Sequence, residues 1–252
     1  MGKRAAAAEA GCALLLTIGS LRIIITDMEE RHSRTALLLG EEGVEKLKKS
    51  RVAVFGLGGV GSFAAEALAR AGVGELLLVD KDKVEESNLN RQLVALYSTI
   101  GKYKAEVMKE RIADIAPDCR AEARVCFYLP DTADEFDLSR YDYVVDAIDN
   151  VTAKICLLSH ARAAGVSVIS AMGAGNKLDP CAFRVGDVSE SRVCPLAKVV
   201  RRELKKRGVS GVKAVWSEEE PRLRADTVGS VSFVPSVMGL IMAGEVIKDL
   251  VR

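Results

Sequence analysis

Short strand-like stretches alternate with helical patterns through most of the chain. The strand candidates are 51–55, 75–80, 120–127, 142–147 and 166–171. Helical patterns separate them at 60–71, 104–116 and 150–164, and a short amphipathic helix over 41–49 precedes the first strand. This alternation predicts an α/β fold with a doubly wound, mainly parallel sheet of the Rossmann type. Right-handed crossovers then favour a strand order of 3-2-1-4-5.

The pattern changes after residue 173. A loop is followed by further candidates: a strand at 181–188, a helix at 195–207, a strand at 211–216 and a last apolar helix at 235–251. Pro235 suits the first turn of that last helix. We expect a single domain over 28–252, with a nucleotide-binding core at 50–175 and a small C-terminal α+β extension at 176–252.

Residues 1–27 do not fit this pattern. They are rich in Ala, Leu and Ile, but Arg22 interrupts the apolar stretch and no clear signal-peptide cleavage site follows. The stretch is also too broken to span a membrane. We therefore expect a leader that is disordered or wrongly assigned, with Met28 as a plausible true start.

A glycine-rich turn follows the first predicted strand. Gly56, Gly58 and Gly61, with Gly59 between them, form a GxGxxG pattern that permits a tight turn, close approach of a phosphate, and close packing of the next helix. Backbone N–H groups at the start of that helix would face the phosphate. Asp80 ends the second strand, where a carboxylate can hydrogen-bond a ribose hydroxyl. The sequence therefore predicts a nucleotide site.

Composition narrows the class of protein only slightly. The 252 residues are 49% hydrophobic and carry a net charge of +1, which fits a globular domain and argues neither for nor against nucleic acid. The six cysteines include no CxxC pair, so a structural zinc site is not expected. Cysteines in apolar surroundings are typical of a reduced, cytoplasmic protein.

Polar and charged residues follow the second and fourth predicted strands: Asp82, Asn88, Arg91, Lys104, Asp146 and Asp149. A guanidinium, an ammonium and two carboxylates beside a phosphate turn suit ATP with Mg²⁺, whereas a nicotinamide dinucleotide does not need them. Two of these assignments have alternatives. Asp146 could cap its strand or support Asp149 instead. Asp82 could serve a magnesium ion or the loop structure, or it could be a plainly solvated side chain.

Several motifs together resemble the ubiquitin-activating-enzyme-like adenylating family, in its order and spacing: RHSR (31–34), GLGGVGS (56–62), DKD (80–82), NLNRQ (88–92), GKYK (101–104) and DAIDN (146–150). His32 replaces the aromatic residue usual in the first motif. The resemblance implies that the glycine turn lies against ATP and that Asp80 holds the ribose. It also implies that a magnesium ion lies near Asp149. The phosphate contacts that it implies come from Asn88, Arg91 and Lys104.

The resemblance also implies a homodimer in which Arg34 reaches into the neighbouring subunit's site. A sulfur-relay protein is a further partner consistent with the family.

Two C-terminal segments, 173–208 and 229–250, resemble the tRNA threonylcarbamoyladenosine dehydratases. That resemblance implies adenylation of the substrate carboxylate next to the anticodon, attack on the activated carbonyl within the same side chain, release of AMP and net loss of water. Such a route needs no enzyme nucleophile. Cys194, at a probable helix N-terminus, is therefore interpreted as a small buried side chain rather than a thioester-forming residue.

The candidate helix at 195–207 supports a tRNA partner modestly. Arg201, Arg202, Lys205 and Lys206 fall on or beside its polar face, which suits an RNA backbone. An ordinary solvated helix face explains the same pattern.

Three other functions remain to be separated from this one. An activator that adenylates the C-terminal glycine of a sulfur-carrier protein would use the same nucleotide site, although missing zinc pairs count against it. A non-catalytic nucleotide-binding subunit would not need Arg91, Lys104 and Asp149 together. A nicotinamide dehydrogenase would not need the NLNRQ block.

Overall fold

The computed structural model describes residues 15–18, 21–24, 30–222 and 228–252, with only the backbone described in the first two segments. A seven-stranded sheet has the order β5-β4-β3-β6-β7-β9-β8. Its strands are β3 (Arg51–Phe55), β4 (Glu75–Val79), β5 (Arg120–Arg124), β6 (Tyr143–Asp146), β7 (Ser167–Ala171), β8 (Phe183–Asp187) and β9 (Lys213–Ser217). The first five strands thus confirm both the α/β fold and the predicted 3-2-1-4-5 order.

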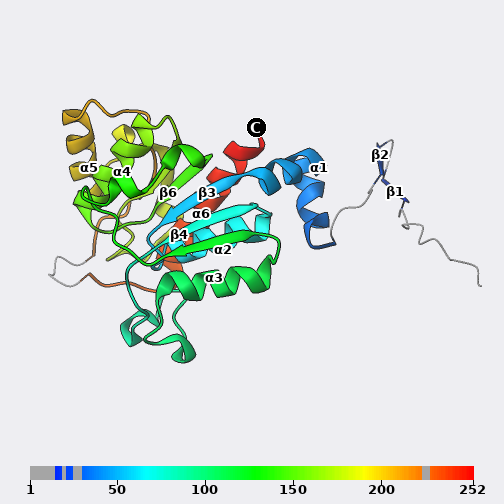
Figure 1. The fold of residues 1–252 in the computed structure, drawn as a ribbon. Coiled ribbons are helices and arrows are strands. Elements are labelled where there is room, and N and C mark those ends of the chain that lie inside the picture. The colour runs from blue at the N-terminus through cyan, green and yellow to red at the C-terminus, as the bar shows by residue number, and fades with distance from the viewer. Residues whose placement is uncertain (1–14, 19–20, 25–29, 223–227) are drawn as a thin grey trace, which may run out of the picture.

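Helices cover both faces of the sheet (Figure 1). They are α1 (Ser33–Lys49), α2 (Gly61–Ala71), α3 (Lys104–Ile115), α4 (Val151–Ala163), α5 (Pro195–Lys206) and α6 (Phe233–Val251). Short 3-10 helices occupy Glu30–His32, Glu86–Asn88, Tyr97–Thr99, Ala133–Glu135, Leu138–Arg140, Pro180–Ala182 and Val188–Glu190. Helices α1, α2, α3 and α6 contribute to one hydrophobic core, and α4 and α5 contribute to the other.

Strand β3 shows why two cores form. Val52 and Val54 belong to the core under α2 and α6, whereas Ala53 and Phe55 belong to the core under α4 and α5. Successive side chains of a strand point to opposite faces, so a strand covered on both faces is apolar throughout.

The helix predicted over 41–49 is longer than expected. It begins at Ser33 and contains a kink at Gly40, whose φ is +76°. The kink at Gly40 lies immediately before the predicted range, so the prediction covers only the second half of α1. Predicted strand 120–127 is shorter than expected, because β5 ends at Arg124.

The C-terminal extension continues the main sheet. Strand β9 pairs parallel with β7, and β8 pairs antiparallel with β9 at the edge. The core and its extension therefore share one sheet.

Near the N-terminus, β1 (Leu15–Ile18) and β2 (Leu21–Ile24) pair only with each other, in a separate two-stranded sheet that the sequence analysis did not predict. The rest of the expected leader over 1–27 lies outside the described residues. In the part of the chain that the structure describes, no helix is long and apolar enough to cross a membrane.

Candidate nucleotide-binding site

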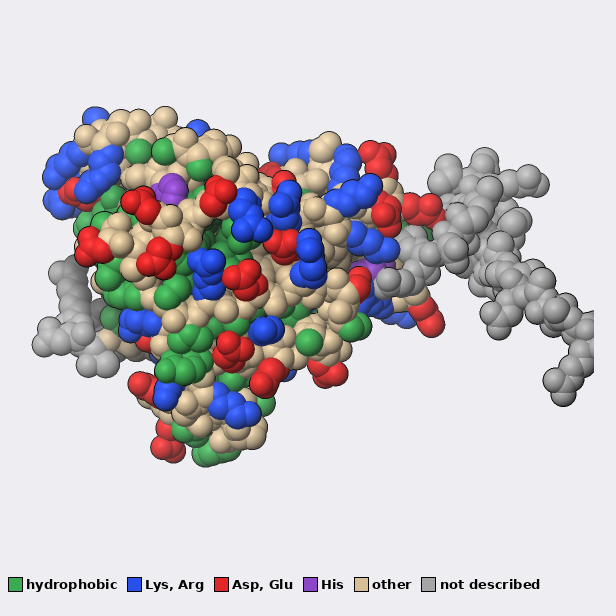
Figure 2. Space-filling model, in the orientation of Figure 1, with side chains coloured by type: hydrophobic (Ala, Val, Ile, Leu, Met, Phe, Trp, Pro, Cys, Tyr) green, Lys and Arg blue, Asp and Glu red, His purple; other side chains and the backbone are tan. Residues whose placement is uncertain are grey.

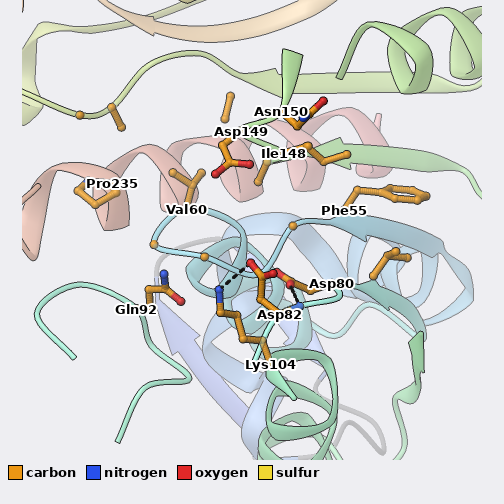
Figure 3. Close-up of a pocket in the computed structure, with 18 of the residues that line it drawn as sticks. Phe55, Val60, Asp80, Asp82, Gln92, Lys104, Ile148, Asp149, Asn150 and Pro235 are labelled. Atoms are coloured by element: carbon orange, nitrogen blue, oxygen red, sulfur yellow. Dashed lines mark hydrogen bonds and ion pairs between the residues drawn. The ribbon is translucent and has the colours of Figure 1, made fainter. Parts of the chain in front are cut away.

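A cavity of about 700 Å³ lies at the carboxyl edge of the sheet, where β3, β4, β6 and β7 end. Its lining includes most of the predicted site: Gly56, Gly58, Gly59, Asp80, Asp82, Arg91, Lys104 and Asp149. Figure 3 shows Asp149 on one side of the glycine turn, with Asp80, Asp82 and Lys104 on the other. Ligands of open α/β sheets bind at this edge, so the position agrees with the sequence-based expectation.

The glycine turn is shaped by close backbone contacts. Gly56 has a φ of +86°, and a Cβ there would lie 2.6 Å from the carbonyl oxygen of Ala147. A Cβ at Gly61 would lie 1.8 Å from the carbonyl oxygen of Gly56. Gly61 itself is not among the cavity-lining residues, and it instead lets α2 start directly against the turn.

The first turn of α2 is suited to an anion. Its N-cap residue, Val60, makes no side-chain capping hydrogen bond, and no acidic residue lies in the first turn. The N–H groups at a helix start need partners, and the helix dipole favours negative charge there. A phosphate bound at the turn would satisfy both requirements.

Asp80 connects two loops of the site. Its Oδ2 accepts a hydrogen bond from the Leu57 N–H at 2.6 Å, and its Oδ1 accepts one from the Asp82 N–H at 2.8 Å. Burial raises the pKa of Asp80, against these two hydrogen bonds and the charge of Lys104. The carboxylate therefore has a fixed orientation at the end of β4.

Lys104 opens α3, and only 8% of its side chain is exposed. Its Nζ lies 3.3 Å from Oδ2 of Asp82, while Lys81 contacts the other oxygen of that carboxylate at 2.7 Å. Burial by itself would raise the pKa of Asp82, but the hydrogen bonds and charges of Lys81 and Lys104 outweigh it and lower that pKa. An ammonium group is thus held in the cavity wall, with Asp82 ionised beside it (Figure 3).

Arg91 and Gln92 form another part of the wall. Nη1 of Arg91 donates to the Ser87 carbonyl at 2.9 Å and to Oδ1 of Asn90 at 2.8 Å. Both bonds use one nitrogen of the guanidinium fork, which has five donor hydrogens. Gln92 is not among the predicted site residues, although it ends the NLNRQ motif. Gln92 is 8% exposed, and its Oε1 finds no hydrogen-bond partner among the described residues.

Asp149 is exposed and lies just before α4, whose N-terminus is capped by Asn150 through the Ala153 N–H at 3.0 Å. No group of three or more His, Cys, Asp or Glu residues is placed to hold a metal ion in the described part of the chain. Mg²⁺ bound with a nucleotide usually needs only one or two carboxylates, because phosphates and water supply the other ligands. Asp149 and Asp82, which line the same cavity, fit that donor set.

Besides Gly61, two other predicted ATP contacts lie outside the cavity lining. Asn88 is 7% exposed, and its Oδ1 accepts from the Glu85 N–H at 3.2 Å, in the turn that precedes Arg91. Asp146 is fully buried and contacts Lys154 at 2.6 Å and Ser170 at 2.5 Å. The structure therefore favours the supporting role that the sequence left open for Asp146.

Arg34 lies at the opposite edge of the sheet from the cavity. The preceding residues fix that position: Arg31 forms an ion pair with Asp118, just before β5, and the buried His32 ring packs against Gly72, just before β4. Arg34 itself is exposed on α1. It does not contribute to the cavity of its own chain.

The structure corrects the predicted basic face of α5 at one residue. Arg201 is partly buried and donates to Oγ of Ser191 at 2.7 Å, so it does not belong to the exposed face. The exposed members are Arg202, Lys205 and Lys206, visible as a group of basic side chains over α5 in Figure 2. Glu203 lies among them, and hydrogen bonds from Lys206, Arg207 and Arg202 lower its pKa to about 2.

Aromatic residues form a wall that the sequence did not reveal. Phe55, Phe127 and Tyr128 line the cavity, and the Tyr128 ring packs edge-on against Phe55 with centroids 5.1 Å apart. They come from β3 and from the segment after β5, so no sequence spacing links them.

The position of Cys194 agrees with its interpretation as a small buried side chain. It is 2% exposed at the N-cap of α5, and its Sγ would lie 3.4 Å from a Cβ at Gly173.

Comparisons with known proteins identify the family. The ThiF family model matches residues 31–252. The tRNA threonylcarbamoyladenosine dehydratase of Bacillus subtilis (strain 168) is 46% identical over 244 residues, which cover 89% of this chain and 96% of the relative. The sulfur carrier protein ThiS adenylyltransferase of Escherichia coli (strain K12) is 32% identical over 225 residues, covering 87% of this chain and 80% of that protein.

A solved structure agrees with this assignment. The structure of E. coli tRNA N6-threonylcarbamoyladenosine dehydratase, TcdA, in complex with ATP matches with a TM-score of 0.84 and 36% identity. The match covers 90% of this chain and 97% of that one. The resemblance found in the sequence motifs is thus confirmed, and the chain belongs to the ThiF family.

Proposed function

We propose that this protein is an ATP-dependent dehydratase that cyclises threonylcarbamoyladenosine in tRNA. The proposal depends mainly on one cavity, in which Arg91, Lys104 and Asp149 surround the glycine turn. This turn leads into α2, whose N-terminus has no side-chain cap. The tRNA threonylcarbamoyladenosine dehydratase of B. subtilis, 46% identical over nearly its whole length, supports this choice of substrate.

The site residues suit the first step of such a reaction. The substrate carboxylate attacks the α-phosphate of ATP, so that a new P–O bond forms and the bond to pyrophosphate breaks. Two anions must be aligned and their charge neutralised, which Arg91, Lys104 and the start of α2 can do. Asp80 would hold the ribose. Asp149 would hold Mg²⁺, with Asp82 in the same cavity as a second possible ligand, and the ion would supply further positive charge to the phosphates when bound.

The second step needs little from the protein. The activated carbonyl is attacked from within the same side chain, AMP leaves and a ring closes. No enzyme nucleophile takes part, in keeping with the burial of Cys194. The tRNA substrate implies a cytoplasmic location.

Adenylation of a sulfur-carrier protein is the second candidate, because the ThiS adenylyltransferase of E. coli is 32% identical over most of its length. Incubation of the protein with ATP and tRNA bearing threonylcarbamoyladenosine, followed by mass spectrometry of the nucleosides, separates the two. We expect the modified nucleoside to lose the mass of one water molecule. Unchanged tRNA, together with ATP–pyrophosphate exchange that depends on a sulfur carrier, would favour the second candidate.

We infer further that the active form is a homodimer in which Arg34 acts in the partner's site. Arg34 is exposed at the edge of the sheet opposite its own cavity, so only another copy can bring it to a nucleotide. Mixing Arg34→Ala with Arg91→Ala tests this, because the mixed dimer would contain one site with both arginines. We expect partial recovery of AMP formation on mixing. No recovery, with subunit exchange demonstrated, would contradict the inference.

We assign the tRNA contact to the exposed face of α5. Replacing Arg202, Lys205 and Lys206 by alanine should weaken tRNA binding and reduce the slope of log K against log salt by about 1 per lost phosphate contact. ATP affinity should not change. An unchanged salt slope would instead identify an ordinary solvated helix face.

A further inference from the structure

A fully buried ionic cluster lies beneath the loop that carries Asp149. Lys154, Asp146 and Ser170 have no exposed surface. The Lys154 ammonium donates to Oδ2 of Asp146 at 2.6 Å, to Oγ of Ser170 at 3.3 Å and to the carbonyl oxygen of Ala171 at 3.0 Å. An ammonium group has three donors, and here it meets three acceptors.

The cluster joins three elements at the carboxyl edge of the sheet. Asp146 is the last residue of β6, Lys154 lies in the first turns of α4, and Ser170 and Ala171 end β7. Ala171 also lines the cavity, whereas Lys154 does not. Lys154 therefore reaches the cavity only through the groups that it holds.

The residues on either side of Asp149 are both held in place, Ile148 by the cluster and Asn150 by the start of α4. On one side, Oδ1 of Asp146 accepts a hydrogen bond from the Ile148 N–H at 3.1 Å. On the other, Asn150 caps α4, the helix that Lys154 fastens to β6 and β7. The Ala147 N–H of the same loop donates to the carbonyl of Phe55, the last residue of β3, at 2.8 Å. The loop also lies against the glycine turn, because a Cβ at Gly56 would lie 2.6 Å from the Ala147 carbonyl oxygen.

Stability alone does not account for such a cluster. A buried ion pair loses its hydration, and apolar residues of similar size are often equally stabilising in its place. What apolar residues cannot supply is a directional link between Ala171, Asp146 and the Ile148 N–H.

We propose that Lys154 is a positioning residue for adenylate formation, which holds the Asp149 loop at a fixed place relative to the glycine turn and the end of β7. This proposal rests on the proposed function. Displacement of reacting groups by as little as 1 Å can cost about 10²-fold in rate, so the loss of the cluster should appear in kcat.

Two variants separate positioning from folding. Lys154→Met leaves Asp146 unpaired, so we expect both the melting temperature and kcat to fall. The triple variant Lys154→Met, Asp146→Leu and Ser170→Ala removes every charge of the cluster. We expect it to recover most of the melting temperature, because no buried charge is left alone. We expect its kcat for AMP formation to stay about 10–10²-fold below wild type, with little change in the KM for ATP.

The control is Lys213→Met, which breaks a similar pair at the other end of the sheet. Nζ of Lys213 lies 2.5 Å from Asp249 and 3.3 Å from Glu245. Asp249 also contacts the Tyr143 hydroxyl at 2.8 Å and Arg252 at 3.4 Å. We expect this variant to lower the melting temperature and leave kcat unchanged. A second comparison uses the Asp149→Ala background, in which the triple variant should cause little further loss because the group that it positions is gone.

The outcomes are distinct. If the wild-type protein converts the tRNA and the folded triple variant has the same kcat, the positioning role alone is refuted. A full additional loss of kcat when the triple variant is made in the Asp149→Ala background would also refute it. Absence of wild-type turnover on tRNA would refute the proposed function, and with it this proposal.

Discussion

Strand β6 begins and ends in clusters of similar chemical make-up, although the first also contains Glu245 and Arg252. At its start, Tyr143 contacts Asp249, which pairs with Lys213. At its end, Asp146 pairs with Lys154 and Ser170. Each cluster thus contains a lysine, an aspartate and a hydroxyl group.

The two clusters differ in burial and in what they hold. Lys213 and Asp249 keep 29% and 22% of their side-chain exposure, and they fasten the end of α6 to β6 and β9. Lys154 and Asp146 have none, and they lie directly behind the cavity wall. We therefore expect changes in the amino-edge cluster to affect stability alone, whereas changes in the carboxyl-edge cluster should also alter the ligand site.

The largest contrast between the edges is expected for single arginines. Arg91→Ala should lower kcat for AMP formation by about 10²–10³-fold, the usual cost of losing one group that stabilises developing charge. The melting temperature should change little, because within the described part of the chain the Arg91 side chain forms hydrogen bonds only with Ser87 and Asn90. The matched change at the amino edge is Arg120→Ala, which removes an exposed ion pair with Glu75. It should change neither kcat nor the melting temperature much. Normal turnover by the Arg91 variant would overturn the site assignment.

Two glycines offer a comparison in which the steric problem is equal. A Cβ at Gly61 would lie 1.8 Å from the Gly56 carbonyl oxygen, and one at Gly74 would lie 1.8 Å from the Lys48 carbonyl oxygen. Each change to alanine should cost about 1–3 kcal/mol of unfolding free energy, as overpacking does, measured by urea unfolding. Only Gly61→Ala should also weaken ATP binding in calorimetry. Equal loss of affinity in both variants would show that the edges are not independent.

The smallest effect is expected at the hydroxyl of the amino-edge cluster. Tyr143→Phe should cost about 1 kcal/mol at neutral pH and leave kcat unchanged. Burial, followed by the hydrogen bond to Asp249, raises the pKa of Tyr143. The protonated hydroxyl therefore stabilises the fold fully below the ordinary tyrosine pKa of about 10, and this contribution is lost as the pH rises from there toward the raised pKa.

Urea unfolding of both proteins between about pH 8 and pH 11 tests that sign. We expect the stability difference between wild type and Tyr143→Phe to shrink as the pH rises. A difference that grows with pH would mean that the hydroxyl is not held in its protonated form.

The sequence predicted the strand order because fully apolar strands, helical patterns and right-handed crossovers leave few arrangements of the first five strands. It also predicted most of the cavity, because Gly56, Asp80 and Asp149 all follow strands whose ends must meet at one edge.

The features that could not be predicted from the sequence depend on the direction in which side chains point. Asp146 and Asp149 are three positions apart, yet the first points beneath the loop and the second lines the cavity. The burial of Arg201 on α5 and the gathering of Phe127 with Phe55 depend likewise on contacts between distant segments. The homodimer and a sulfur-relay partner stay predictions.

The two hydrogen bonds that Asp80 accepts from the main chain have a bearing on nucleotide choice. A carboxylate held through both oxygens cannot swing aside, so a sugar with an extra phosphate at the hydroxyl that Asp80 is proposed to hold would meet a fixed negative charge. If Asp80 holds the ribose as proposed, we expect discrimination against such phosphorylated nucleotides to depend on the same two bonds that shape the loop.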